Sequence, residues 1–336
     1  MSFDRMPYAD VEVTLSQEVS DSIRACISAL YHDVHREHVC DNHALITGYD
    51  FHITPSGPRL IEVNANAGGL FALLNHPRQS HAEQTRVTQM FVEACAEECV
   101  ATDTISPVVA ILDQNPEQQF LYPEFVEIAQ VLSTAGYRMR IADTEACAYI
   151  EGKGLYLADE HIDMVYLRDT DFLLATERTH ALRAAYEAGE VLITPNPREH
   201  VLLSDKQRLC EFTHPVVLPA TLLTPANRED AWSRRQELVF KPVGGFASKG
   251  VYRGDKLSRA RFDLLLAEAP YIAQERADPD VITVPTREGD RVMKYDIRAY
   301  AYQDRLYVLG ARVYDGQVTN LRTPGGGFAP VRVITP

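Results

Sequence analysis

The sequence lacks the features that would direct it into a membrane or out of the cell. No stretch approaches the roughly 18 consecutive apolar residues that span a bilayer. The N-terminal segment MSFDRMPYADVEV has no basic region followed by an apolar run, which is the pattern of a signal peptide. We therefore predict a cytoplasmic protein with no membrane association.

Basic residues are also in short supply. Lys and Arg total 33 against 47 Asp and Glu, which gives a formal net charge of −14. Nucleic-acid backbones and anionic membranes would repel such a chain, so neither is expected as its partner. A local basic pocket can still bind phosphates, so this charge is compatible with a nucleotide ligand.

Metal-binding cysteine pairs and the two commonest nucleotide signatures are missing. The six cysteines are scattered, and although Cys95 and Cys99 can share a helix face, free thiols in a reducing compartment are the favoured interpretation. No G-x-G-x-x-G follows the first strand of the central region, and G-x-x-x-x-G-K-[ST] does not occur. A dinucleotide fingerprint and a Walker loop are therefore excluded.

Hydrophobic periodicity divides the chain into three regions. Residues 1–103 are predicted to hold helices over 15–40 and 80–100, with a strand pair over 45–51 and 59–63 between them. Residues 104–203 begin with the apolar run PVVAIL and alternate strands with helices, which indicates a parallel, Rossmann-like α/β unit. Residues 204–336 are rich in strands. The predicted strands there are 238–242, 271–274, 293–302 and 305–313.

A strand that delivers a lysine to a loop of small residues lies at 240–251, FKPVGGFASKGV. Glycines let backbone N–H groups approach phosphate oxygens closely, and a lysine supplies a compact positive charge. The candidate nucleotide contacts are Lys241, Gly244, Gly245, Ser248 and Gly250. Taken alone, the segment fits a plain hairpin turn about as well.

Two carboxylates and an amide lie on the strand pair near the N-terminus. Glu62 and Asn64 point to one face because strand side chains alternate, and Asp50 joins them if the two strands form a hairpin. Three such oxygen donors suit Mg²⁺ that bridges nucleotide phosphates. A solvated strand face is the alternative, but the surrounding LIEVNANAGG is unusually apolar and small for one.

Arginines follow on two strands of the last region. Asp296, Arg298 and Tyr300 share a face by the same alternation. Arg312 lies on the next strand, and Asn320 follows it. Guanidinium groups hold phosphate oxygens in a fork geometry, so Arg298 and Arg312 are candidate contacts of a transferring phosphate. Exposed cross-strand ion pairs are the ordinary alternative.

Two smaller features complete the pattern. Lys206 follows Ser204 and Asp205, either of which would cap a helix and bring the lysine to a nucleotide phosphate, although a surface lysine is the more ordinary interpretation. Residues 323–329, TPGGGFA, are predicted as a flexible loop that closes over a substrate, with a linker or a frayed tail as alternatives.

Together these segments resemble the ATP-grasp superfamily, and within it the glutathione-synthetase-like branch. That family carries a K-P strand with a small-residue loop, an acidic residue after a strand (here Gln274-Glu275), a D-x-R strand, a second arginine, an asparagine and a glycine loop. Its last section carries G-x-D followed by E-x-N, matched by Gly48-Tyr49-Asp50 and Glu62-Val63-Asn64. Here that section comes first, so the resemblance implies a circularly permuted order.

The resemblance also implies a fold class and a domain division. The fold class is α/β, with α+β ATP-grasp lobes and a Rossmann-like pre-ATP-grasp domain. Residues 1–103 correspond to the C-terminal part of the ATP-grasp domain with its metal-binding hairpin, and residues 104–203 to the pre-ATP-grasp domain. Residues 204–336 correspond to the N-terminal and central ATP-grasp lobes.

The implied activity is ATP-dependent joining of a carboxylate to an amine through an acyl phosphate, with release of ADP and phosphate. Expected partners are the small-molecule carboxylate and amine; homo-oligomerisation is left open. The metal is one or two Mg²⁺, for which Mn²⁺ can substitute. By resemblance, the phosphates are held by Lys206, Lys241 and the glycine segment, the adenine or ribose by Gln274 and Glu275, the metal by Asp50, Glu62 and Asn64, and the reacting groups by Arg298, Arg312 and Asn320.

Two details of the sequence modify what the resemblance implies. Residue 49 is Tyr where D-alanine ligases carry arginine, so contact with the phosphate would rest more on Arg298 and Arg312. Asp113 and Arg168 lie at or just beyond strand ends of the middle region, where open α/β sheets bind ligands. They are therefore candidates for substrate recognition, with a turn aspartate and a surface arginine as the alternative.

Two other functions fit parts of the sequence. A phosphotransferase in which a hydroxyl attacks ATP needs a base, and His52 is the one histidine near the predicted site. It would make a phosphate ester instead of an amide. A nucleotide-binding pseudoenzyme would bind ATP without turnover, but the joint presence of Lys241, Glu62 and Arg298 argues against it.

Overall fold

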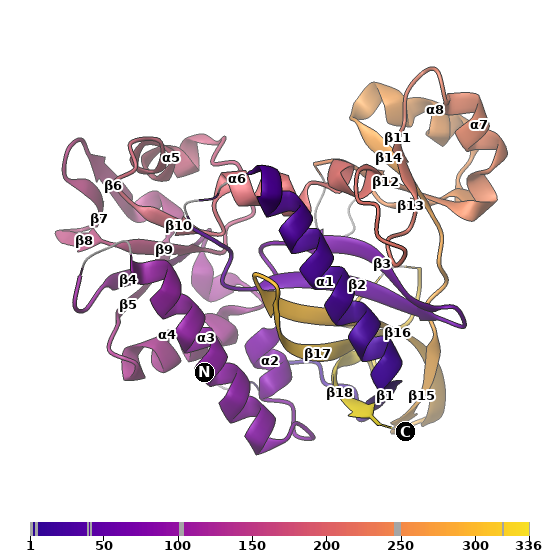
Figure 1. Ribbon diagram of the computed structural model, residues 1–336, viewed down its shortest axis with the longest axis horizontal. Coiled ribbons are helices and arrows are strands. Elements are labelled where there is room, and N and C mark those ends of the chain that lie inside the picture. The colour runs from indigo at the N-terminus through magenta and orange to yellow at the C-terminus, as the bar shows by residue number, and fades with distance from the viewer. Residues whose placement is uncertain are drawn as a thin grey trace.

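The computed structural model describes residues 3, 6–38, 40, 42–100, 104–244, 250–317 and 319–335. Figure 1 shows a large sheet in the middle of the molecule, a parallel α/β unit to its left and a small lobe at the upper right. The mixed helix and strand content confirms the predicted α/β class.

The large sheet draws its strands from both ends of the chain. Its order is β1-β18-β17-β16-β2-β3, and β15 pairs with β16 beside this path. The central contact joins β2 to β16 in antiparallel register, and β1 runs parallel to β18. The strands are β1 (Val13–Ser16), β2 (Thr47–Thr54), β3 (Gly57–Asn64), β15 (Val281–Thr286), β16 (Gly289–Tyr302), β17 (Arg305–Tyr314) and β18 (Gly327–Ile334).

Alternation along β16 divides the side chains of this sheet between two faces. Ile297 and Ala299 pack in one core with the buried stripe of α1 (Gln17–Glu37), which crosses the sheet in Figure 1. Tyr300 and Tyr302 belong to a second core with α2 (Leu70–Leu74) and α3 (His81–Cys99). Lys294, Asp296 and Arg298 share this second face by the same alternation, and Lys294 and Arg298 line the pocket described below.

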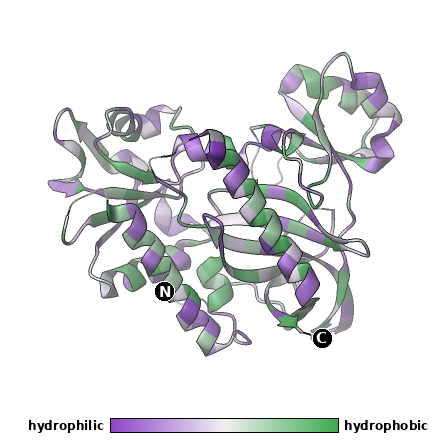
Figure 2. Ribbon diagram, viewed as in Figure 1, coloured by the Kyte–Doolittle hydropathy of each residue, from purple (hydrophilic) through white to green (hydrophobic). Residues whose placement is uncertain are grey.

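Helix starts follow from the sequence. Ser16 accepts a hydrogen bond from the Val19 N–H at 3.3 Å, and Ser80 accepts one from the Glu83 N–H at 3.1 Å. Both serines satisfy N–H groups that a helix terminus leaves without partners. Figure 2 shows hydrophilic and hydrophobic segments alternating along α1 and α3, as expected for helices with one face in a core.

The α/β unit holds a four-stranded parallel sheet of order β10-β9-β4-β5 and a three-stranded sheet of order β6-β7-β8. All six residues of β4 are buried, which explains the uninterrupted apolar run in the sequence. Its elements are β4 (Val108–Asp113), α4 (Tyr122–Thr134), β5 (Arg138–Asp143), β6 (Cys147–Ile150), β7 (Gly154–Leu157), β8 (Glu160–Ile162), β9 (Met164–Leu167), α5 (His180–Glu187), β10 (Leu192–Thr194) and α6 (Pro197–Glu199).

The small lobe has a core of its own. Phe240, Phe262 and Leu265 are fully buried in a cluster that includes no residue of the large sheet. Its four-stranded antiparallel sheet has the order β11-β14-β12-β13. The elements are β11 (Ala220–Leu222), α7 (Arg228–Ser233), β12 (Leu238–Pro242), β13 (Tyr252–Arg253), α8 (Arg259–Glu268) and β14 (Tyr271–Glu275).

Most of the predicted elements are confirmed within a few residues, and the cysteines Cys26, Cys40, Cys95, Cys99, Cys147 and Cys210 are free thiols. The predicted loop over 323–329 is partly wrong, because Gly327 begins β18 and this strand pairs with β17 and β1. Backbone pairing holds the segment in place, so it is not a frayed tail. No helix among the described residues is long and apolar enough to cross a bilayer.

Candidate functional site

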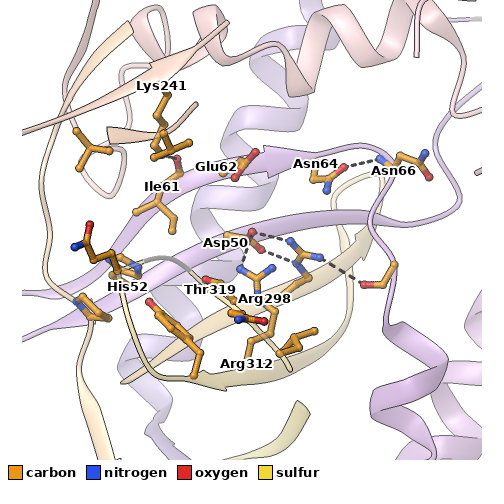
Figure 3. Close-up of a pocket in the computed structure, with 18 of the residues that line it drawn as sticks. Asp50, His52, Ile61, Glu62, Asn64, Asn66, Lys241, Arg298, Arg312 and Thr319 are labelled. Carbon is orange, nitrogen blue, oxygen red and sulfur yellow. Dashed lines mark hydrogen bonds and ion pairs between the residues drawn. The ribbon is translucent and has the colours of Figure 1, made fainter. Parts of the chain in front are cut away.

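A pocket of about 810 Å³ lies where the three parts of the molecule meet. Its lining includes Glu62 and Arg298 from the large sheet, Lys241 and Gln274 from the small lobe, and Arg168 from the α/β unit. Figure 3 shows Glu62 and Asn64 on one strand, Asp50 on the next, and two arginines that converge on Asp50. Residues as far apart in the sequence as Asp50 and Arg298, which are 248 positions apart, thus contribute to one cavity.

Cross-strand register sets the charged side chains in a row. Asp50 is the partner of Glu62 on one side and of Arg298 on the other. Asp296 lies opposite Arg312 on the neighbouring strand pair. Residues directly opposite each other in a sheet project to the same face, so these groups all point away from α1 and toward the cavity or its floor.

Asp50 is saturated by arginine. Its carboxylate accepts Nε and Nη2 of Arg298 at 2.6 and 2.7 Å, and Nη2 of Arg312 at 2.9 Å. Burial alone would raise the pKa of Asp50, but the two guanidinium groups outweigh it and lower the pKa to about 2. Asp50 is therefore ionised at neutral pH and holds both arginines in place.

Arg312 bridges two carboxylates. Its Nε donates to Asp296 at 2.6 Å, and Asp296 also accepts the Thr319 hydroxyl at 2.5 Å. Burial disfavours the charged guanidinium, but Asp296 and Asp50 raise the pKa of Arg312 above its ordinary value. Asn320, the next residue in the chain, is exposed, lines the pocket and accepts the backbone N–H of Arg322 at 3.0 Å.

The predicted metal ligands lie on neighbouring strands and all three line the pocket. Glu62 Oε1 pairs with the Lys206 ammonium at 3.1 Å, and Asn64 Oδ1 accepts the Asn66 N–H at 2.9 Å. Among the described residues, no group of three His, Cys, Asp or Glu side chains is placed to hold a metal ion. Glu62 and Asn64 keep lone pairs for a cation, whereas Asp50 must give up an arginine N–H to bind one.

Lys241 reaches the large sheet from the small lobe. Its ammonium donates to the Ile61 carbonyl at 2.7 Å, so the lysine lies against the strand that carries Glu62 and Asn64. Alternation on β12 explains its direction, because Phe240 points into the lobe core while Lys241 points into the pocket. Burial lowers the pKa of Lys241 to about 8, and Glu62 partly opposes this effect.

The other predicted nucleotide contacts are divided. Gln274 is buried and lines the pocket, and its Nε2 has no hydrogen-bond partner among the residues that the structure describes. Glu275 also lines it and pairs with Arg234 at 3.4 Å.

Lys206 is 6% exposed and contacts Glu62 without lining the pocket itself. It begins a short 3-10 helix that Asp205 caps. Gly244 and Gly250 are not among the residues that line the pocket, and Gly245 and Ser248 lie outside the described residues.

Sequence reasoning missed several groups at the site. Asn66 and Gly68 line the cavity just beyond Asn64, and Thr319 holds Asp296 from the loop after β17. Glu124 on α4 accepts the Gly69 N–H at 2.9 and 3.0 Å and fixes this loop from the α/β unit. The repeat in NANAGG was a usable signal for Asn66, whereas nothing near Glu124 in the sequence marks it.

Comparison with known proteins identifies the fold. No protein-family model and no curated protein match the sequence. A glutathione synthetase-like effector from Globodera pallida, in its apo form, has a TM-score of 0.61 at 11% identity, over 98% of this chain and 90% of that one. A putative gamma-glutamylcysteine synthetase from Methylobacillus flagellatus KT has a TM-score of 0.57 at 14% identity, over 95% and 88%. The chain therefore has the fold of these two structures, as its resemblance to glutathione-synthetase-like proteins predicted.

Proposed function

We propose that the protein is an ATP-dependent ligase that joins a carboxylate to an amine and releases ADP and phosphate. The observation that carries this proposal is the meeting of Lys241 with Glu62, Asn64 and Arg298 in one cavity. A phosphate-binding cation from one lobe thus faces metal-binding oxygens and an arginine from another. Such an arrangement suits a triphosphate that lies between the two lobes.

The chemistry requires an activated carboxylate, because an oxide anion is a poor leaving group in amide formation. In the proposed reaction a carboxylate oxygen attacks the γ-phosphorus of ATP and ADP leaves. The amine nitrogen then attacks the acyl carbon, loses a proton, and inorganic phosphate leaves with the C–O bond electrons. The protein contributes positioning and charge neutralisation.

Each lobe would have a distinct role. Lys241 and Lys206 would hold the α- and β-phosphates, since an ammonium group supplies a compact positive charge. Gln274 and Glu275 would contact adenine or ribose. The Nε2 of buried Gln274 has no hydrogen-bond partner in the described part of the chain, which supports a polar ligand there.

Arg298 and Arg312 would contact the transferred phosphate, and Asn320 would lie beside them. Their carboxylate partners hold the guanidinium groups in position before a ligand arrives, which lowers the cost of organising the site.

The donor set fits Mg²⁺, with Mn²⁺ as a substitute, because carboxylate and amide oxygens are the ligands these cations prefer. Glu62 and Asn64 would hold the ion, with Asp50 as a third ligand if it exchanges an arginine N–H. When bound, the cation would neutralise the phosphate charge. Lys206 would then be released from Glu62 toward the nucleotide.

The chain order is proposed to be circularly permuted relative to the family, with boundaries near residues 103 and 203. Support comes from β1, β2 and β3, which complete one sheet with β15 to β18 from the other end of the chain. Residues 104–203 hold the separate parallel sheet expected of a pre-ATP-grasp domain.

The test is Mg²⁺-dependent ADP release in the presence of paired carboxylate and amine panels, with the product identified by mass spectrometry. Glu62→Gln is expected to lower turnover at least about 100-fold without loss of fold, because a metal contact is removed. Glu160→Gln, a carboxylate outside the pocket, is the matched control. Full turnover in Glu62→Gln would count against the assigned metal site.

The same assay separates the alternatives. A phosphate ester product would indicate a phosphotransferase with His52 as its base. In this structure Nδ1 of His52 donates to the Ala277 carbonyl at 2.6 Å, so Nε2 would be the atom that accepts the proton. Tight ATP binding without any turnover would indicate a pseudoenzyme.

A further inference from the structure

We propose that the α/β-unit end of the pocket binds the α-amino-acid end of the substrate, with the carboxylate on Arg168 and the ammonium on Asp113. This deepens the proposed function by naming a substrate class. Both residues are buried, at 8% and 7% exposure, and both line the pocket. They occupy the positions just after or at the ends of the parallel strands β9 and β4, where such sheets bind ligands.

Arg168 is a buried cation without a carboxylate partner. Among the ion pairs of the described residues, none includes it. Its Nη1 donates to Asn66 Oδ1 and to the Ala67 carbonyl at 3.3 Å. Nε and Nη2 have no hydrogen-bond partner in the described chain. A buried guanidinium is ordinarily paired, so the free N–H groups indicate an anionic ligand.

The Glu124 carboxylate, which interacts electrostatically with Arg168, is already used. Glu124 receives Gly69 N–H and, at 2.9 Å, Phe71 N–H, so its oxygens are committed to the loop. Aromatic rings cover the other sides of the guanidinium, with the Arg168 Cζ atom 5.9 Å from the centroid of Phe125 and 5.4 Å from that of Tyr166. Flat aromatic walls and a planar fork of donors favour a carboxylate in the open direction.

Asp113 supplies the complementary charge. One of its oxygens accepts the Gln114 N–H at 2.7 Å, and the other has no partner among the described residues. Leu112 and Leu167 are register partners, so the next residues along the two strands, Asp113 and Arg168, are neighbours. Burial raises the pKa of Asp113 to about 6, which an ammonium ligand would reverse.

The subsite adjoins the reaction centre. Arg168 contacts the Ala67 carbonyl, and Arg298 approaches the next carbonyl, Gly68, at 3.5 Å. The two arginines therefore hold successive peptide units of one loop. An amino acid anchored on Arg168 would present its side chain, or the rest of a peptide, to Arg298.

The experiment measures binding by isothermal titration calorimetry on the full chain, with and without Mg²⁺ and the non-hydrolysable ATP analogue AMPPNP. The probes are the twenty L-amino acids and short γ- and α-linked glutamyl dipeptides. Each probe that binds is compared with its α-carboxamide and its N-acetyl derivative. The variants are Arg168→Gln, Arg168→Lys and Asp113→Asn, with Arg140→Gln, an exposed arginine outside the pocket, as the matched control.

The expected result is at least roughly 30-fold weaker binding of the α-carboxamide than of the acid in the wild type. Arg168→Gln should abolish this discrimination, Arg168→Lys should keep part of it, and Asp113→Asn should abolish discrimination against the N-acetyl derivative. Unchanged AMPPNP affinity in each variant shows an intact fold. A purely structural role for Arg168 would weaken acid and carboxamide equally and would overturn the proposal.

Other outcomes also decide the question. If the carboxamide binds the wild type as well as the acid does, or if no probe binds a chain that binds AMPPNP, the proposal is wrong. If amino acids bind with the expected discrimination but AMPPNP does not bind, the subsite stands and the ligase assignment fails. The two conclusions are thus distinguishable.

Discussion

Asp50→Asn is the perturbation with the most definite consequence. The change removes the only carboxylate within reach of Arg298 in the described chain, while Arg312 keeps Asp296. The side chains of Asp50 and Arg298 are 3% and 11% exposed, so solvent cannot replace the lost charge. Breaking a buried pair on one side costs about 3–5 kcal/mol, and we expect about 3 kcal/mol here.

The pKa of Asp50 gives a second figure for the free energy that this ion pair contributes to folding. A shift from 3.8 to about 2 corresponds to about 2 kcal/mol of stabilisation by the ionised carboxylate. Because the folded pKa lies below the unfolded one, this contribution is present above roughly pH 4 and is lost as the pH falls toward 2. The difference between wild type and Asp50→Asn should therefore narrow in acid.

The assay is urea unfolding followed by far-ultraviolet circular dichroism. The single tryptophan, Trp232, lies on α7 in the small lobe and would not report on the large sheet. Asp10→Asn is the matched control, since Asp10 and Arg78 form an exposed pair with 68% and 50% of their side chains accessible. That change should cost less than about 1 kcal/mol.

Two results would refute the reasoning. The first is a free energy of unfolding for Asp50→Asn that matches that of Asp10→Asn. The second concerns the double variant Asp50→Asn/Arg298→Met, in which no unpaired charge remains. We expect it to recover part of the lost stability, and a cost equal to the sum of the two single changes would contradict the buried ion pair.

Two further predictions concern the small lobe. The pKa of Lys241 is about 8, so this lysine loses its positive charge above pH 8 and the affinity for ADP should fall by up to about tenfold per pH unit there. Calorimetric titration with ADP at several pH values tests this. Lys241→Gln should remove the pH dependence. Phe262→Ala should destabilise the small lobe by about 3–5 kcal/mol, because Phe262 is fully buried between Trp232 and Phe240. In Phe262→Ala, amide hydrogen exchange should accelerate in β12 and β14 while α3 stays protected. Phe91→Ala in α3 should give the reverse pattern. If either variant accelerates exchange in both regions, the small lobe and the core around α3 are not independent.

Local pattern was enough to predict the elements that carry the site. The run PVVAIL became a fully buried parallel strand, and alternation placed Glu62 and Asn64 on one face of β3. Both predictions depend only on neighbours in the sequence. The resemblance to ATP-grasp proteins added the expectation that Lys241 faces them, and these residues do line one pocket.

The pairing of strands that lie far apart in the chain could not be predicted from the sequence. Nothing in the residues around Asp50 shows that β16 would bring Arg298 opposite it, because that pairing joins positions 248 residues apart. The end of the segment 323–329 was predicted as a loop because its strand partners are also distant in the sequence. Gly327 begins a strand only because β17 and β1 provide edges to pair with.

Arg298 and Arg312 are present in a protein of strongly negative net charge because carboxylates balance both of them locally. Asp50 and Asp296 hold Arg298 and Arg312, and Glu62 holds Lys206. An anion that enters must compete with these carboxylates for the same N–H groups, so a bare phosphate gains little. In the function proposed above, a ligand that brings a divalent cation would engage Glu62 and Asp50 and would thereby free the lysine and arginine donors. The arrangement of charges thus favours a metal–nucleotide complex over the nucleotide alone.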